Sequence, residues 1–107
     1  MPRTRLAKVE DVPENGTLGV KTDNGYYLIS KMDGDINVLE GRCTHMKGPL
    51  RFGKVIDGSV KCPIHGARYD LRSGEVTKQV AIPLIGKAKD LKKFPITIQD
   101  GEIFIKE

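Results

Sequence analysis

The sequence predicts an all-β protein, a small antiparallel sandwich or barrel of about eight to ten strands. Turn-forming residue pairs recur along the chain, and short runs with an apolar residue at every second position lie between them. Helical periodicity is nearly absent. Its one candidate, residues 86–93, is short and Lys-rich, so we expect a loop or a single turn there. The length of 107 residues predicts a single domain over residues 1–107.

The expected strands follow one another between turns that have glycine in second place. Asn-Gly and Asp-Gly pairs supply the positive φ angles that two-residue hairpin turns require. The turn pairs are Asn24-Gly25, Asp33-Gly34, Asp57-Gly58, Ser73-Gly74 and Asp100-Gly101. The apolar runs between them are residues 6–9, 18–20, 26–29, 36–39, 55–56, 60, 96–98 and 103–105. This order is typical of consecutive antiparallel hairpins.

Two segments interrupt this pattern and are expected to be loops. Residues 41–53 contain three glycines, one proline and few β-forming residues, and residues 62–66 form a shorter second loop. The two loops hold every cysteine and histidine of the chain, namely Cys43, His45, Cys62 and His65. Any site built from soft ligands therefore lies where these loops meet.

The positive charge of the chain is concentrated around the same loops. The net charge is +4, and residues 41–80 carry 8 basic and 3 acidic residues. Such an excess is either an ordinary solvated surface or a positive face that meets an acidic partner. The basic residues form no Lys/Arg run and have no interleaved aromatic residues, so we expect no nucleic-acid binding.

Membrane insertion and export are not expected. A membrane-spanning helix needs about 20 consecutive apolar residues. The longest apolar run, residues 80–85, has six residues and contains a proline. The charged N-terminus does not lead into an apolar segment of the kind found in signal peptides. We therefore expect a cytoplasmic protein without a membrane partner.

The spacing of the soft ligands is C-x-H, then sixteen residues, then C-x-x-H. One interpretation is a Cys₂His₂ zinc site in a zinc-stabilised interaction module, although zinc sites usually pair C-x₂₋₄-C with H-x₃₋₅-H. Another is a Cys43–Cys62 disulfide, which a cytosolic protein disfavours and which leaves the histidine spacing unexplained. The third is a two-iron, two-sulfur cluster with two thiolates on one iron and two imidazoles on the other.

The segment GRCTHMKGPLRFGKVIDGSVKCPIHGARYDLRSGEV resembles the cluster-binding segment of Rieske proteins, C-x-H-x₁₆-C-x-x-H-G. The length and the flanking β pattern are similar to those of small soluble Rieske-type ferredoxins. The resemblance implies the Rieske (ISP) fold, with two cluster-binding loops in a subdomain at residues 41–80 and a Rieske-type [2Fe-2S] cofactor. It also implies that Cys43 and Cys62 bind the inner iron, and that His45 and His65 bind the outer iron through Nδ atoms.

The resemblance extends to residues around the ligands and includes departures. Backbone amides near Met46, Gly48 and Ile64 are expected to donate to the sulfides. Gly48 and Ile64 also stand where respiratory Rieske proteins have a second cysteine pair, so that disulfide is excluded. Ala67 replaces a serine that bonds a bridging sulfide, whereas Tyr69 matches the tyrosine that donates to the sulfur of the first cysteine. One hydroxyl fewer predicts a potential in the lower half of the Rieske range of about −150 to +300 mV.

No catalytic group remains once both cysteines and both histidines are assigned, so we expect an electron carrier and not an enzyme. The resemblance implies a ferredoxin that passes electrons from a reductase to an oxygenase or another terminal oxidoreductase. An alternative is the Rieske-like small subunit of a nitrite reductase or another multi-subunit redox enzyme. Cations beside the ligands are expected to form a positive rim that steers an acidic partner, namely Lys47, Arg51, Lys61 and Arg68.

Overall fold

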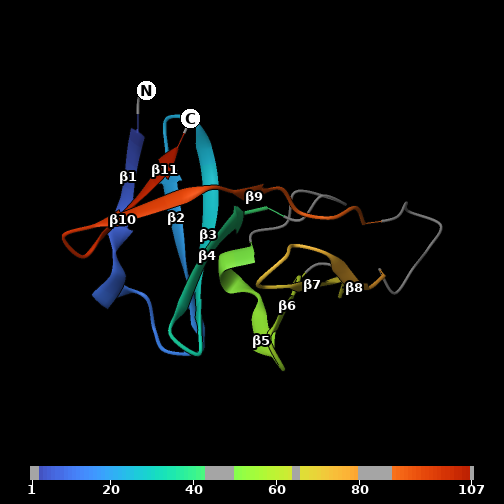
Figure 1. The fold of residues 1–107 in the computed structure, drawn as a ribbon. Coiled ribbons are helices and arrows are strands. Elements are labelled where there is room, and N and C mark those ends of the chain that lie inside the picture. Colours follow the sequence, from blue (N-terminus) through green and yellow to red (C-terminus); the bar gives the residue numbers. More distant parts are fainter. Residues whose placement is uncertain (1–2, 43–49, 64–65, 80–87, 107) are drawn as a thin grey trace.

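The computed structural model describes residues 3–42, 50–63, 66–79 and 88–106 (Figure 1). These residues contain eleven strands and two short 3₁₀ helices, which confirms the all-β prediction with slightly more strands than expected. No helix within these ranges is long and apolar enough to cross a membrane. The strands are β1 (Arg3–Lys8), β2 (Gly16–Thr22), β3 (Gly25–Met32), β4 (Asp35–Glu40), β5 (Lys54–Ile56), β6 (Ser59–Lys61), β7 (Arg68–Asp70), β8 (Val76–Lys78), β9 (Lys93–Phe94), β10 (Ile96–Gln99) and β11 (Glu102–Lys106). The helices are η1 (Val9–Asp11) and η2 (Leu50–Phe52).

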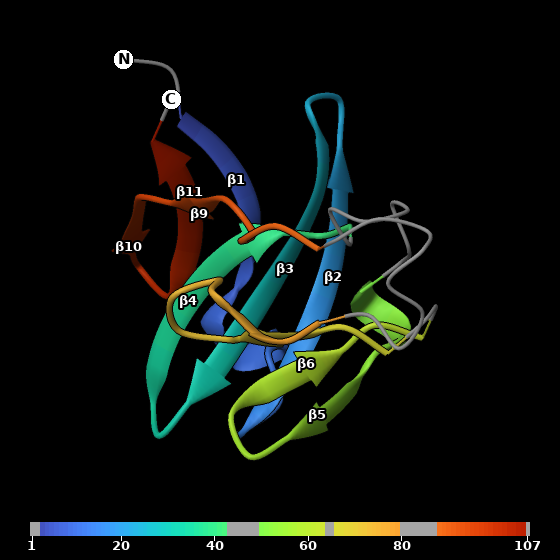
Figure 2. The same ribbon diagram turned by 90° about the vertical axis from the view of Figure 1, so that its right-hand side faces the viewer.

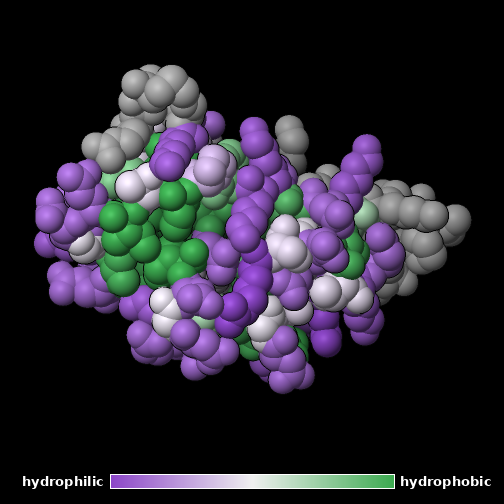
Figure 3. Space-filling view, in the orientation of Figure 1, coloured by the Kyte–Doolittle hydropathy of each residue, from purple (hydrophilic) through white to green (hydrophobic). Residues whose placement is uncertain are grey.

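The strands form three antiparallel sheets, with strand orders β1-β11-β10, β2-β3-β4-β9 and β5-β6-β7-β8. The second of these lies between the other two, so that the molecule has three layers (Figures 1 and 2). Apolar side chains show at the end formed by the first sheet (Figure 3), where Ile98 of the edge strand β10 is 49% exposed. The third sheet carries the second predicted loop at one end of its strands.

The middle sheet buries both of its faces, which explains the dense apolar run in β3. Leu28 pairs with Leu39 of β4, and both belong to the buried cluster shared with the third sheet. The next pair, Ile29 with Val38, belongs to the buried cluster shared with the first sheet. Directly opposed residues in an antiparallel pair point to the same face, so consecutive pairs supply the two cores in turn.

A buried hydroxyl ties the middle sheet to the third sheet. Ser30 of β3 is 1% exposed, and its hydroxyl donates to the carbonyl oxygen of Leu71 at 3.2 Å. Leu71 itself is fully buried and follows β7 directly. A polar group in a core is costly unless it is hydrogen-bonded, so this bond fixes how the two sheets lie against each other.

All three expected Asp-Gly turns are confirmed. Asp33-Gly34, Asp57-Gly58 and Asp100-Gly101 each have positive φ at both residues, as a type I′ turn requires. The first hairpin differs, because Thr22 pairs with Gly25 and the turn residues are therefore Asp23 and Asn24.

A local hydrogen bond explains why that first turn lies one residue earlier than expected. The amide of Asn24 donates to the hydroxyl of Thr22 at 3.1 Å. Asn24 consequently has no positive φ, and Gly25 becomes the first residue of β3. At Ser73-Gly74 only the glycine has positive φ, in a turn where the Asp70 carboxylate accepts the amides of Arg72 and Ser73.

Within the helical candidate at residues 86–93, the described part begins at residue 88. Residues 88–92 have no regular secondary structure, which agrees with a loop, and Lys93 begins β9. Strands β7, β8 and β9, of two or three residues each, were not expected from the sequence. Hydrogen bonding of β7 to β6, of β8 to β7 and of β9 to β4 makes them strands.

Candidate metal centre

The first predicted loop is closed at its base by the backbone. Gly41 follows β4, and its carbonyl oxygen accepts the amide of Leu50 at 3.1 Å. The amide of Gly41 in turn donates to the carbonyl oxygen of Tyr26 at 2.9 Å, which ties this base to β3. The predicted ligands Cys43 and His45, with Met46 and Gly48, belong to the segment between these two ends and lie outside the described residues.

The second loop is closed in a similar way. Cys62 directly follows β6, and its amide donates to the carbonyl oxygen of Ala67 at 2.7 Å, just before β7 begins. Gly66 has a φ of 75°, a left-handed conformation that glycine adopts without a steric cost. Ile64 and His65 lie within this loop and outside the described residues. Both loops therefore begin and end at hydrogen-bonded bases.

Close packing brings the two bases together. A Cβ atom added to Gly53, which follows η2, would lie 2.6 Å from the carbonyl oxygen of Lys61 and 2.7 Å from a methyl carbon of Val60. Only glycine lets the chain leaving the first loop approach β6 this closely. One buried cluster then contains residues from the ends of both loops, including Leu50, Cys62 and Ala67.

Cys62 is the one predicted ligand that the described residues include, and its position fits a metal-binding thiolate. Its side chain is 1% exposed and belongs to the apolar cluster, but it also borders an open pocket of about 540 Å³. A thiol at the boundary between an apolar core and a pocket can bind a metal from the interior side. The donor set in the two loops, two sulfurs and two imidazole nitrogens, suits a diiron centre of mixed ligation.

The two described residues of the expected surroundings, Ala67 and Tyr69, are both fully buried. The methyl group of Ala67 provides no hydroxyl at the place where the resemblance puts a serine. Tyr69 lies in β7 opposite Val60 of β6, in the same cluster as Cys62. Its expected contact with Cys43 involves a residue outside the described part of the chain.

Gln79 follows β8 and is hydrogen-bonded to Ala88 through a side chain that the sequence analysis did not single out. The amide group of Gln79 bonds the backbone of Ala88 twice. Its Nε2 donates to the Ala88 carbonyl oxygen at 3.2 Å, and its Oε1 accepts the Ala88 amide at 3.0 Å. Gln79 also lines the pocket that Cys62 borders. A single glutamine carries no sequence signal for such a bridge.

Cations surround the partly buried ring of Tyr26 at the base of the first loop. The guanidinium carbon of Arg42 lies 3.9 Å from the ring centroid of Tyr26. The guanidinium carbon of Arg51 lies 5.7 Å from the same centroid, and the Lys21 Nζ atom lies 5.6 Å from it. A hydrogen bond from Arg42, and then the charge of Lys21, lower the pKa of Tyr26 below its usual value of 10.0. This patch places positive charge directly before Cys43 in the chain.

The expected positive rim is described in part. Arg51 lies against the ring of Phe52, with the guanidinium carbon 4.6 Å from its centroid. Lys61 is exposed, and Arg68 is partly buried with an Nε atom that has no hydrogen-bond partner. Lys47 lies outside the described residues.

Comparisons with known proteins agree with this geometry. The profile of the Rieske [2Fe-2S] domain matches residues 3–95. The ferredoxin component of the naphthalene 1,2-dioxygenase/salicylate 5-hydroxylase systems of Ralstonia sp. is 28% identical over 100 residues, which cover 94% of this chain and 90% of that protein. The 3-phenylpropionate/cinnamic acid dioxygenase ferredoxin subunit of Photorhabdus laumondii is 29% identical over 106 residues, or 98% and 94% of the two chains.

A solved structure agrees as well. The Sphingomonas yanoikuyae B1 ferredoxin has a TM-score of 0.84 at 26% identity, and the match covers 99% of each chain. The profile match spans both loops and most of the surrounding sheets. The chain belongs to the Rieske [2Fe-2S] domain family, and its cofactor is a Rieske-type [2Fe-2S] cluster.

Proposed function

We propose that this chain is a one-electron carrier that accepts electrons from a reductase and passes them to a terminal oxygenase. The relatives named above are ferredoxin components of dioxygenase systems, and this chain spans at least 90% of their lengths. The description of the first of these relatives as a ferredoxin component favours a carrier over a small subunit of a larger enzyme. The observation that carries the proposal is the paired C-x-H and C-x-x-H motif on two loops with adjoining bases.

In this proposal Cys43 and Cys62 hold the inner iron, and His45 and His65 hold the outer iron. When bound, the cluster takes up and releases one electron. Two ferric ions, two sulfides, two thiolates and neutral imidazoles have no net charge, so adding an electron is easier than for an all-cysteine cluster. Cys62 is buried, which supports its place on the interior side of the centre.

The surroundings of the ligands support a potential in the lower half of the Rieske range. Ala67 provides no hydroxyl to a sulfide, and each hydrogen bond to a cluster sulfur favours the electron-rich reduced state. We assign Tyr69 as a donor to the Cys43 sulfur and the amides near Met46, Gly48 and Ile64 as donors to the sulfides. The partner docks at the basic face near the cluster, to which Arg51, Lys61 and Arg68 contribute together with Lys47.

The test is the iron and acid-labile sulfide content of the protein as isolated, together with its reduction potential. We expect two irons and two sulfides per chain, and a brown colour that bleaches with dithionite. A colourless protein that contains zinc would contradict the proposal.

A substitution tests the ligand set. His65→Cys replaces a neutral ligand by an anionic one, so the potential should fall while the cluster is retained. Lys106→Cys adds a thiol on the exposed end of β11, at the opposite side of the molecule, and should leave the potential unchanged. An unchanged potential in His65→Cys would remove His65 from the ligand set.

A further inference from the structure

The strand register of the third sheet aligns four cations in one row. Lys54 of β5 is opposite Lys61 of β6, Lys61 is opposite Arg68 of β7, and Arg68 is opposite Lys78 of β8. Neighbouring strands are about 4.8 Å apart, so each cation has a like charge close beside it. Like charges directly opposed across strands destabilise a sheet. This cationic row runs along the end of the sheet that carries Cys62.

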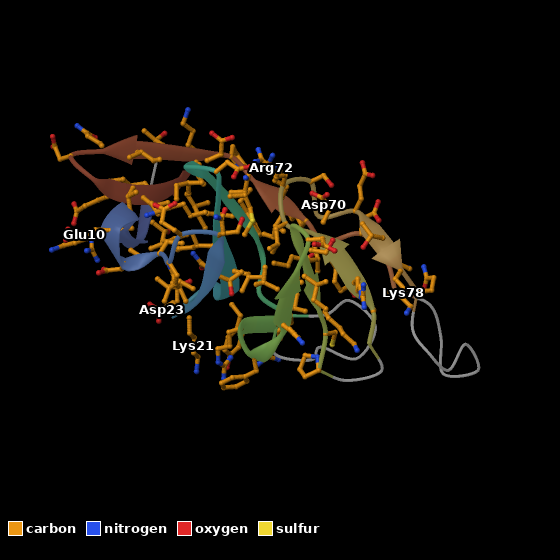
Figure 4. The ribbon with its side chains drawn as sticks, turned by 90° about the horizontal axis from the view of Figure 1, so that it is seen from below. Glu10, Lys21, Asp23, Asp70, Arg72 and Lys78 are labelled. Carbon is orange, nitrogen blue, oxygen red and sulfur yellow. The ribbon has the colours of Figure 1, made fainter. Side chains whose placement is uncertain are left out.

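No member of the cationic row forms an ion pair with another described residue. The ion pairs within those ranges join Arg5 to Glu102, Lys31 to Glu14, and Arg72 to Asp33 and Asp35, and none includes a member of the row. Arg72 belongs to the turn at the other end of the third sheet. Figure 4 shows Lys78 at the end of β8, away from Asp70 and Arg72. Carboxylates therefore neutralise Arg72 at one end of the third sheet, whereas the cationic row at the other end has no ion-pair partner among the described residues.

A pocket with a mixed lining opens between the cations of the row. Lys54, Lys61 and Lys78 line the open pocket of about 540 Å³ that Cys62 borders. Phe52 lines the same pocket and is 68% exposed, the largest exposure of any large apolar side chain in the described ranges. Three ammonium groups beside an exposed aromatic ring suit carboxylates that flank an apolar side chain.

We propose that the cationic row and Phe52 form the docking site for an acidic segment of the electron-accepting oxygenase, a segment that carries carboxylates around an apolar side chain. This inference rests on the carrier function proposed above and identifies the surface and the chemistry of its partner. Docked carboxylates compensate the row, whereas the apolar side chain covers Phe52. Because Cys62 borders the pocket, the partner lies next to the centre that donates the electron.

The charge of the centre indicates the acceptor as the occupant. The oxidised centre is neutral, and one added electron makes it an anion, which the nearby row stabilises. Carboxylates docked on the row cancel that stabilisation and favour release of the electron. By linkage, an acidic segment must then bind the oxidised protein more tightly than the reduced protein. The docked segment therefore lowers the potential of the centre and drives the electron toward a partner that accepts it.

The experiment uses the cluster-containing full chain and a short peptide of alternating glutamate and leucine as the probe. Titration calorimetry measures its affinity for wild type, for Lys54→Gln/Lys78→Gln and for Lys8→Gln/Lys106→Gln. The last variant removes the same two charges from exposed positions in the first sheet. We expect the row variant to bind about tenfold more weakly than wild type at low salt, and the control to bind like wild type.

Potentials recorded with and without the peptide test the assignment to the acceptor. The peptide should lower the potential of wild type, by about 59 mV for each tenfold preference for the oxidised form, and should have a smaller effect on the row variant. Equal affinity of both double variants, no binding to wild type at low salt, or tighter binding to the reduced protein would overturn the inference. Cluster content and dithionite reduction, measured on the same samples, test the carrier function separately.

Discussion

Gly53→Ala is the substitution for which the structure makes the sharpest prediction. A Cβ atom at this position would lie 2.6 Å from the Lys61 carbonyl oxygen, 2.7 Å from Val60 Cγ2 and 3.0 Å from the Leu50 carbonyl oxygen. Two of these neighbours are backbone atoms, so no side-chain rotation relieves the contact. The chain leaving the first loop must move away from β6, and therefore away from Cys62, which directly follows β6.

The expected cost follows from measured overpacking of cores. Inserting a methyl group into a closely packed site destabilises a protein by about 1–3 kcal/mol. For a domain of this size, each kcal/mol lowers the melting temperature by roughly 4 °C. We therefore expect Gly53→Ala to melt roughly 4–12 °C below wild type and to retain less than the full amount of iron and sulfide.

Gly58→Ala in the turn of the same hairpin is the matched control. Its φ is +77°, but a Cβ atom there would meet nothing within 4 Å. The left-handed conformation costs an alanine about 1–2 kcal/mol, so the two variants should lose comparable stability. Thermal unfolding followed by circular dichroism, together with visible absorbance per chain, separates the two effects. Full cluster content in Gly53→Ala, or equal cluster loss in Gly58→Ala, would refute the reasoning.

Three further predictions concern single side chains. The Tyr26 phenol should titrate below 10.0 by phenolate absorbance, because Arg42 lowers its pKa, and Arg42→Gln should raise it. Any stability from this phenolate is present above pH 10 and is lost as the pH falls through the lowered pKa, so it contributes nothing at neutral pH. Ala67→Ser should raise the potential by roughly 40 mV in voltammetry, if about 1 kcal/mol of hydrogen bonding to a sulfide is gained on reduction. Ser30→Ala should cost about 1 kcal/mol in denaturant unfolding, because the buried Leu71 carbonyl oxygen loses its donor.

The hairpins could be predicted because their chemistry is local. An Asp-Gly pair supplies positive φ at both turn positions whatever the rest of the fold does, and three such turns form as expected. The first hairpin departs from this rule because the hydroxyl of Thr22 accepts the amide of Asn24 and moves the turn by one residue. Competition from a neighbouring side chain is visible only when the backbone path is known.

Features that depend on contacts between distant segments could not be predicted. The cationic row requires the pairing register of four strands, and Lys54 and Lys78 carry no signal by themselves. The close approach of Gly53 to β6 and the bridge between Gln79 and Ala88 are likewise tertiary contacts. The two loops, in contrast, are evident from their glycines and from the clustering of cysteine and histidine.

The ligand set is the central claim, and pulsed electron paramagnetic resonance of the dithionite-reduced protein tests it most directly. With nitrogen-15 incorporated into histidine, the account predicts hyperfine couplings from two different imidazole nitrogens bound to the same iron. Since His45 and His65 are the two histidines of the chain, each substitution should remove one coupling. A reduced cluster that shows no histidine coupling, or only one, would contradict it.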